Sequence, residues 1–193
     1  MATTYRTSNP AAGPDTRWRT RDIVVAAVIG VAFGLAFVLA GGIWKALEVL
    51  GPLQNVAYGI WLLPAIVAPL IIRKPGAALF AEMVAAGLSA VLGSAWGADT
   101  LLSGFAQGAA AELVFAFTLY RSWSMPVLMI AGLASAAAAF VHDAAVYYSA
   151  LAGDALLVIA IAMAVSGAIF LPFVAIALVR ALRGTGVLDG FPA

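Results

Sequence analysis

The sequence predicts an all-α integral membrane protein, a six-transmembrane-helix bundle with its N- and C-termini in the cytoplasm. Apolar residues make up 64% of the 193 residues, charged residues make up 10%, and the mean hydropathy is +1.05. A soluble domain carries roughly 45–50% apolar and about 25% charged residues, so this chain has too few charges to cover a surface in water. Its apolar residues also gather in runs of about 20, the length that crosses a bilayer as a helix.

A polar segment with Pro10, Gly13 and Pro14 precedes the first apolar run. We expect residues 1–20 to form a disordered cytoplasmic tail. The run that follows is longer than the core of a cleaved signal peptide, which indicates a retained helix. Residues 21–183 are expected to form the six-helix membrane domain, and residues 184–193 a cytoplasmic C-terminal tail.

Short connections separate the apolar runs, which favours antiparallel packing of sequence neighbours. Gly51-Pro52 precedes the second run, and Arg73-Lys74-Pro75-Gly76 separates it from the third. The stretch 41–55 either continues the first helix or forms a short interfacial helix. The predicted spans are residues 23–40, 56–72, 77–95, 100–120, 126–151 and 155–182.

The basic residues predict the orientation, because lysine and arginine stay preferentially on the cytoplasmic side. Of the ten in the chain, only Lys45 falls in a connection on the side opposite the N-terminus, together with Glu48, Asp99 and Asp154. We therefore expect a multi-pass protein of the plasma membrane with both termini inside. The nine basic residues that agree are Arg6, Arg17, Arg19, Arg21, Arg73, Lys74, Arg121, Arg180 and Arg183.

Small residues recur every four positions on the first helix, at Ala26, Gly30 and Gly34. In lipid, such a face lets two helices approach closely. It fits an internal contact between helices, and it equally fits a strip that docks on another membrane subunit.

Ionisable residues inside the apolar runs are the clearest functional signal. A charged side chain at mid-bilayer costs at least ~2.5–3.5 kcal/mol on insertion scales, and such residues usually line a pathway or a site. Several also share helix faces with polar and aromatic residues. The candidate binding residues are Glu82, Glu112, Asn55, Tyr58, Trp61, Ser89, Trp96, Gln107, His142, Asp143 and Tyr147.

Carboxylates beside aromatic rings suit a flat, cationic or amine-bearing heteroaromatic ligand, through stacking, cation–π attraction and charge-assisted hydrogen bonds. Structural roles fit the same residues. Glu82 or Glu112 can be a protonated carboxyl that bridges helices, and His142 with Asp143 can be a polar pair at the outer interface. Tryptophans at helix ends can form an interfacial belt.

Several function classes find no support in the sequence. The net charge of +1 offers no basic face for nucleic acid, and there is no cysteine. No phosphate-binding glycine loop is present, so the chain does not hydrolyse ATP itself. Ser103-Gly104 lacks the preceding glycine of an intramembrane serine protease, and one histidine is too few for a catalytic metal site. We expect no enzymatic activity, no metal and no cofactor.

Four stretches of the chain carry a resemblance to a known family, and the likeness spans most of residues 20–183. They are Arg21-Asp22-Ile23-Val24, Gly51-Pro52-Leu53-Gln54-Asn55-Val56-Ala57-Tyr58-Gly59 with Trp61, Pro75-Gly76-Ala77-Ala78-Leu79-Phe80-Ala81-Glu82, and Gln107-Gly108-Ala109-Ala110-Ala111-Glu112-Leu113. With them the chain resembles the substrate-binding (S) component of an energy-coupling factor (ECF) transporter, and most closely the YkoE-type component linked to thiamine and its hydroxymethylpyrimidine precursor.

The resemblance implies a subunit that captures its ligand outside the cell and works with a transmembrane coupling (T) subunit and cytoplasmic ATPase subunits. Ala26, Gly30 and Gly34 match the docking strip of such components, although they mix alanine and glycine where the family pattern has alanines. In the pocket, a ring would stack between aromatics, and Glu82 or Glu112 would accept hydrogen bonds from the ring amine. Asn55, Gln107 or His142 would orient the ligand.

Two other functions remain open from the sequence. A proton-coupled secondary carrier of a small amine would use Glu82, Glu112 and His142 as a relay. The absence of a visible inverted repeat disfavours that reading. A structural membrane protein with no transport role would use the same residues only to hold its helices together.

Overall fold

The computed structural model describes residues 16–192, and these residues form helices joined by short turns, with no strand among them. The predicted disorder of the N-terminal tail therefore lies, for residues 1–15, outside the described residues. The helical elements are α1 (Thr20–Ala46), η1 (Leu47–Leu62), α2 (Pro64–Ile72), α3 (Ala77–Val91), α4 (Asp99–Phe117), α5 (Met125–Val146), α6 (Gly153–Val165), η2 (Ser166–Phe170) and α7 (Leu171–Gly184).

Four helical stretches are long and apolar enough to cross a membrane, which confirms the all-helical membrane class. They are Thr20–Ile72, Asp99–Phe117, Met125–Val146 and Gly153–Gly184. Helix α3 is apolar but shorter, at 15 residues. The count of six spans and the cytoplasmic location of the termini stay predictions.

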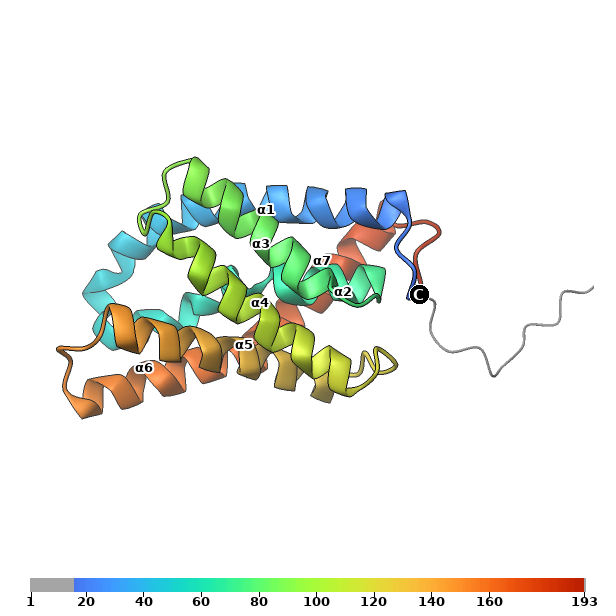
Figure 1. Ribbon diagram of the computed structural model, residues 1–193. Coiled ribbons are helices and arrows are strands. Elements are labelled where there is room, and N and C mark those ends of the chain that lie inside the picture. The colour runs from blue at the N-terminus through green and yellow to red at the C-terminus, as the bar shows by residue number, and fades with distance from the viewer. Residues whose placement is uncertain (1–15, 193) are drawn as a thin grey trace, which may run out of the picture.

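The helices run back and forth between two ends of the molecule (Figure 1). The terminal end, as we call it, contains the start of α1, the turn 73–76, the turn 118–124 and the end of α7. The opposite end, the pocket end, contains the end of α1, the turn 92–98 and the connection 147–152. Most of the arginines and lysines lie at the terminal end, in agreement with the charge asymmetry of the sequence.

The small-residue face of α1 packs against α3 inside this chain. A Cβ atom at Gly30 would lie 2.6 Å from Cβ of Val84, and one at Gly34 would lie 2.9 Å from the carbonyl oxygen of Ala85. Ala26 is fully buried in the core. The prediction that this strip docks on a partner subunit is therefore wrong for this structure, because the close approach of two backbones already fills it.

The second predicted span differs most from a regular helix. Residues Leu47–Leu62 wind as two 3₁₀ pieces interrupted at Gly51, and the α-helical part begins only at Pro64. Gly51 has φ 55°, in the left-handed region that glycine adopts without strain, and the following Pro52 cannot donate a backbone hydrogen bond. The chain therefore turns at Gly51 and re-enters the bundle as the tighter segment that lines the pocket.

The sixth predicted span is continuous but not uniform. Helix α6 passes into the π-helical turn η2 and then into α7. Ser166 in this turn is buried, and its hydroxyl accepts a hydrogen bond of 2.7 Å from the backbone N–H of Gly59 in η1. This hydrogen bond thus joins the two irregular segments, η1 and η2, in the interior.

The predicted C-terminal tail begins where α7 ends, at Gly184. Leu188 is buried, and the ring of Phe191 lies 4.5 Å from the guanidinium carbon of Arg21. The described part of this segment folds back onto the start of α1 at the terminal end.

Candidate functional site

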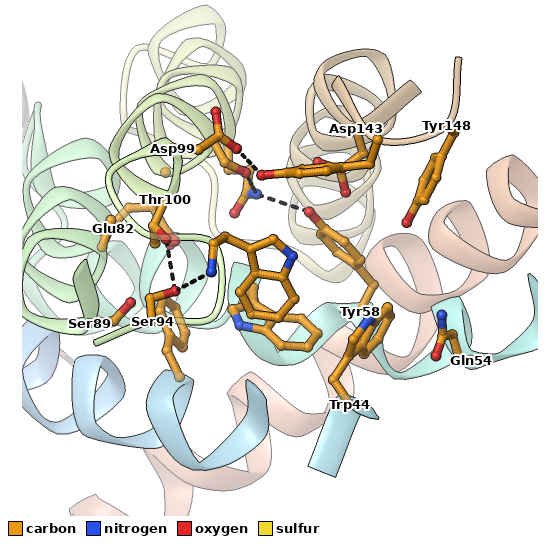
Figure 2. Close-up of a pocket in the computed structure, with 18 residues that line it drawn as sticks. Trp44, Gln54, Tyr58, Glu82, Ser89, Ser94, Asp99, Thr100, Asp143 and Tyr148 are labelled. Atoms are coloured by element: carbon orange, nitrogen blue, oxygen red, sulfur yellow. Dashed lines mark hydrogen bonds between the residues drawn. The ribbon is translucent and has the colours of Figure 1, made fainter. Parts of the chain in front are cut away.

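A cavity of ≈ 210 Å³ opens between the helices at the pocket end. Side chains from α1, η1, α3, α4, α5 and the turns beside them line it (Figure 2). Eight of the predicted site residues belong to this lining. They are Tyr58, Trp61, Glu82, Ser89, Trp96, Gln107, Asp143 and Tyr147.

One wall of the pocket is a connected group of aromatic rings. The ring centroid of Trp61 lies 4.8 Å from that of Trp44, 5.5 Å from that of Tyr58 and 5.5 Å from that of Trp96. The contacts of Trp61 with the two other tryptophans are edge-on, a preferred geometry for aromatic pairs. These rings come from α1, η1 and the turn before α4, so folding is what brings them together.

Glu82 lies in the pocket lining and is fully buried. Its Oε2 accepts a hydrogen bond of 3.1 Å from the backbone N–H of Ala65. Ala65 sits in the first turn of α2, directly after Pro64, where the N–H has no partner within the helix. The first turn of α2 thus holds one carboxylate oxygen, while Oε1 is buried with no hydrogen-bond partner.

The pocket is acidic. Asp99 and Asp143 line it together with Glu82, and no lysine or arginine is among the described residues of the lining. Apart from His142, which contacts Asp99 and Asp143, these three carboxyl groups have no ion-pair partner among the described residues, so their oxygens in a partly apolar cavity favour a cationic or hydrogen-bond-donating ligand.

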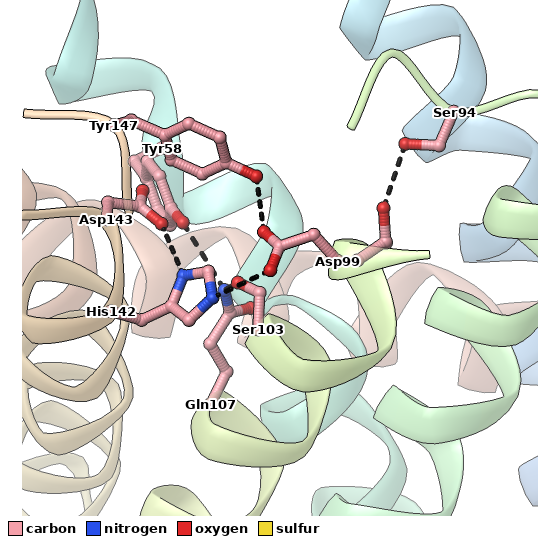
Figure 3. A network of polar contacts seen from close by, with 9 residues as sticks. Tyr58, Ser94, Asp99, Ser103, Gln107, His142, Asp143 and Tyr147 are labelled. Atoms are coloured by element: carbon pink, nitrogen blue, oxygen red, sulfur yellow. Dashed lines mark hydrogen bonds and ion pairs between the residues drawn. The ribbon is translucent and has the colours of Figure 1, made fainter. Parts of the chain in front are cut away.

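His142 connects the two aspartates at the mouth of the pocket (Figure 3). Its Nδ1 lies 2.9 Å from Oδ1 of Asp143, and its Nε2 lies 3.2 Å from Oδ1 of Asp99. The hydroxyl of Tyr147 donates to the other oxygen of Asp99. This network joins the start of α4 to the end of α5, and it fixes both carboxylates in place.

Two tyrosines beyond the end of α5 remain protonated donors. Burial and the neighbouring Asp143 raise the pKa of Tyr148 to about 12. Burial and the hydrogen bond to Asp99 raise the pKa of Tyr147 well above its ordinary value. Both hydroxyls therefore keep their protons at physiological pH.

Gln107 fixes the base of the pocket between α4 and η1. Its side-chain amide donates to the hydroxyl of Ser103 at 2.6 Å and to the hydroxyl of Tyr58 at 3.3 Å. Its backbone carbonyl accepts from Ser135 on α5 at 2.6 Å. The orienting role of Gln107 toward a ligand stays a prediction.

Glu112 does not belong to the pocket. Its carboxylate accepts hydrogen bonds from the backbone N–H groups of Gly76 at 2.6 Å and Ala78 at 2.9 Å, and from the hydroxyl of Tyr120 at 2.7 Å. It caps the first turn of α3 at the terminal end, where a helix has free N–H groups and favours negative charge. The expectation that Glu112 contacts the ligand is wrong, because the carboxylate is already saturated elsewhere.

Two other predicted residues act beside the pocket without lining it. Asn55 is buried, and its amide nitrogen donates to the carbonyl of Pro52 at 3.0 Å, which stabilises the turn of η1. His142 contacts Asp99 and Asp143, which line the pocket, as described above. In this structure His142 holds two lining carboxylates in place, and Asn55 braces the turn at the start of η1.

Several lining residues were not predicted. The sequence alone is compatible with Trp44 as part of an interfacial belt, and it places Asp99 in a connection on the side opposite the N-terminus. Asp99 directly precedes the predicted span 100–120, and Tyr147 lies near the same end of the neighbouring span. This shared level was the one signal in the sequence that could have placed Asp99 in the pocket. The lining residues not predicted are Phe37, Trp44, Gln54, Ala86, Ser94, Asp99, Thr100, Ser103, Gly104 and Tyr148.

Known proteins resemble this chain in sequence and in structure. Residues 21–138 match the family described as "ABC-type cobalt transport system, permease component". The "Putative HMP/thiamine permease protein YkoE" of Bacillus subtilis (strain 168) is 36% identical over 176 residues, which cover 90% of this chain and 88% of that protein. A solved structure, described as "Crystal structure of an S-component of ECF transporter", superimposes with a TM-score of 0.86 at 36% identity and covers 90% of each chain.

The sequence match and the structural match extend over nearly the whole of each chain. They confirm the resemblance drawn from the sequence. The chain belongs to the family of S components of energy-coupling factor transporters, and it is a multi-pass transport protein of the plasma membrane.

Proposed function

We propose that this S component captures thiamine or its hydroxymethylpyrimidine precursor from outside the cell, in the acidic and aromatic pocket at the pocket end. The name of the B. subtilis relative, an HMP/thiamine permease, supports this ligand class. The pocket chemistry supports it independently, since thiamine joins an aminopyrimidine to a positively charged thiazolium ring.

The free oxygen of Glu82 is the observation on which the proposal depends most. A buried oxygen of a carboxyl group that lacks a hydrogen bond costs more than ~1–3 kcal/mol, because it has lost water and gained nothing. The exocyclic amine of an aminopyrimidine supplies such a donor. We therefore assign the recognition of the pyrimidine amine to Oε1 of Glu82.

The remaining pocket groups suit the other parts of the ligand. The flat rings suit stacking against the wall centred on Trp61, and a thiazolium cation suits the aromatic faces and the carboxylates of Asp99 and Asp143. The precursor has no thiazolium, so it would use the Glu82 side of the pocket alone.

Uptake also needs an energy source. We propose that the chain works with an ECF transmembrane coupling subunit and cytoplasmic ATPase subunits, as expected for an S component. Since α3 covers the strip of Ala26, Gly30 and Gly34, a coupling subunit would dock on another part of the helical surface.

Titration of the purified protein with thiamine and with hydroxymethylpyrimidine, followed by tryptophan fluorescence, tests this function. We expect saturable binding of both, and a loss of affinity of at least about tenfold (~1.4 kcal/mol) for both ligands in Glu82→Gln. Glu48→Gln is the matched control, since Glu48 is exposed and outside the pocket. Absence of binding by the wild-type protein, or equal affinities of Glu82→Gln and wild type, would contradict the assignment.

A further inference from the structure

The terminal end contains a second concave site, of ≈ 630 Å³ and more open than the ligand pocket. The start of α1, the turn after α2, the turn between α4 and α5 and the segment after α7 form its walls. Basic side chains dominate it, among them Arg21, Arg73, Lys74 and Arg121. Nothing in the capture of a vitamin at the other end of the molecule uses this basic site.

The positive charge of the basic site is not balanced within the described chain. Asp22 is the one acid among its described lining residues, and Nζ of Lys74 already binds this carboxylate at 2.5 Å. Nε of Arg21 lies 3.8 Å from the same side chain. Arg73 and Arg121 form no ion pair with any described residue and leave an excess of positive charge.

Arg73 has the surroundings of a cation that lacks its counterion. Its Nε is buried with no hydrogen-bond partner, and its guanidinium carbon lies 5.9 Å from the ring centroid of Trp123. Burial and the nearby charge of Arg183 lower the pKa of Arg73. An anion in the site would pair with the Arg73 side chain and screen the repulsion between Arg73 and Arg183.

We propose that this basic site binds a phosphate group, held by the guanidinium groups of Arg73 and Arg121. A guanidinium presents a planar fork of donors that matches the oxygens of a phosphate. Arg73 and Arg121 line the same site from two different turns, 73–76 and 118–124, so one phosphate group in it would be held from two sides.

The position of the basic site favours an anionic phospholipid as the source of the phosphate. Trp123 lines the site, and tryptophan is typical of the level of lipid headgroups. Phe117 and Leu119, next to the site along the chain, are 87% and 62% exposed and offer an apolar surface for acyl chains. Basic pockets at the ends of membrane helices bind anionic headgroups by this combination of charge and apolar contact.

Native mass spectrometry of the full chain in detergent tests this proposal, with phosphatidylglycerol, phosphatidylcholine, glycerol phosphate and inorganic phosphate as separate probes. We expect saturable binding of phosphatidylglycerol that weakens at least tenfold in Arg73→Gln/Arg121→Gln. Arg180→Gln is the control, because it removes a basic residue of α7 that does not line the site. Arg121→Gln alone serves if the double variant unfolds, since Arg121 is exposed.

The probes separate the sources of the phosphate. Binding of phosphatidylglycerol that depends on the two arginines, without binding of the soluble phosphates, supports a lipid site. Arginine-dependent binding of the soluble phosphates at the same strength supports a phosphate site filled from solution. Failure of every phosphate probe to bind, or equal binding by wild type, the arginine variants and Arg180→Gln, would overturn the proposal.

Discussion

Glu82 and Glu112 show how the surroundings of a single residue decide its role. Both interrupt apolar runs, and both accept hydrogen bonds from the first turn of a helix. Glu112 is saturated by three backbone N–H groups and a tyrosine hydroxyl, whereas Glu82 keeps one oxygen free in a cavity. One carboxylate is therefore structural, and the other is available to a ligand.

Replacement of Glu112 should reduce stability and leave ligand affinity unchanged. In Glu112→Gln an amide nitrogen faces a backbone N–H donor of α3, and a charged acceptor is lost. We expect the free energy of unfolding to fall by roughly 1–3 kcal/mol, measured by thermal unfolding in detergent, with thiamine affinity within twofold of wild type. Glu48→Gln, at an exposed acid, should leave both unchanged. A stable Glu112→Gln protein with weakened binding would contradict this division of roles.

At the residue scale the sequence could single out the buried acids but not their partners. A charged residue in an apolar run is conspicuous in the sequence whatever surrounds it in the fold, so Glu82 and Asp143 are candidate binding residues from the sequence alone. Asp99 was not selected, because it lies in a connection, where an acid is unremarkable. Its place in the site depends on His142 and Tyr147, which lie more than 40 residues away in the chain.

Helices α1 and α3 pack closely against each other next to the pocket. Val84 and the backbone of α3 fill the space beside Gly30, while a Cβ at Gly42 in the same helix would meet nothing within 4 Å. The alternating small residues of α1 therefore fix the spacing of the two helices. Further along α1, a Cβ at Gly41 would lie 3.5 Å from the ring of Trp96, so the same helix face continues to the aromatic wall of the pocket.

Two alanine substitutions in α1 distinguish the contribution of the α1–α3 contact to stability from that of helix propensity. Gly30→Ala introduces a Cβ 2.6 Å from Val84, so the helices must move apart, and we expect a loss of roughly 1–3 kcal/mol in the free energy of unfolding. Gly42→Ala should be neutral or slightly stabilising, because alanine is the better helix former. Thermal unfolding of the two variants checks this, and equal melting temperatures would show that the α1–α3 contact is loose.

The irregular elements mark the limit of prediction at the element scale. Gly51-Pro52 indicated a break before the second span, and the structure has its turn there. The 3₁₀ winding of Leu47–Leu62 was not visible, because it depends on contacts with distant segments such as the hydrogen bond from Gly59 to Ser166. The π turn Ser166–Phe170 likewise lies inside an unbroken apolar run.

The whole molecule has opposite chemistry at its two ends. Acidic groups and the aromatic wall surround the cavity at the pocket end, and basic groups surround the concave site at the terminal end. The charge asymmetry of the sequence predicted this separation of basic residues, and it predicts that the pocket end faces the outside.

The lack of cysteine in the chain makes this orientation directly measurable. Ser124 lies at the terminal end and Ala152 at the pocket end, and both are exposed. A membrane-impermeant maleimide should label Ala152→Cys on intact cells, and Ser124→Cys only after permeabilisation. Labelling with the reverse pattern would place the pocket on the cytoplasmic side and exclude capture from outside.

The central claim is that the aromatic and acidic cavity at the pocket end is the place where the vitamin binds. Isothermal titration of thiamine into purified wild type, Trp61→Ala and Trp123→Phe tests it most directly, because Trp61 is the centre of the aromatic wall and Trp123 lies at the opposite end. We predict one site per chain, a loss of at least about tenfold (~1.4 kcal/mol) in affinity for Trp61→Ala, and no change for Trp123→Phe. Equal thiamine affinity in all three proteins would contradict the claim.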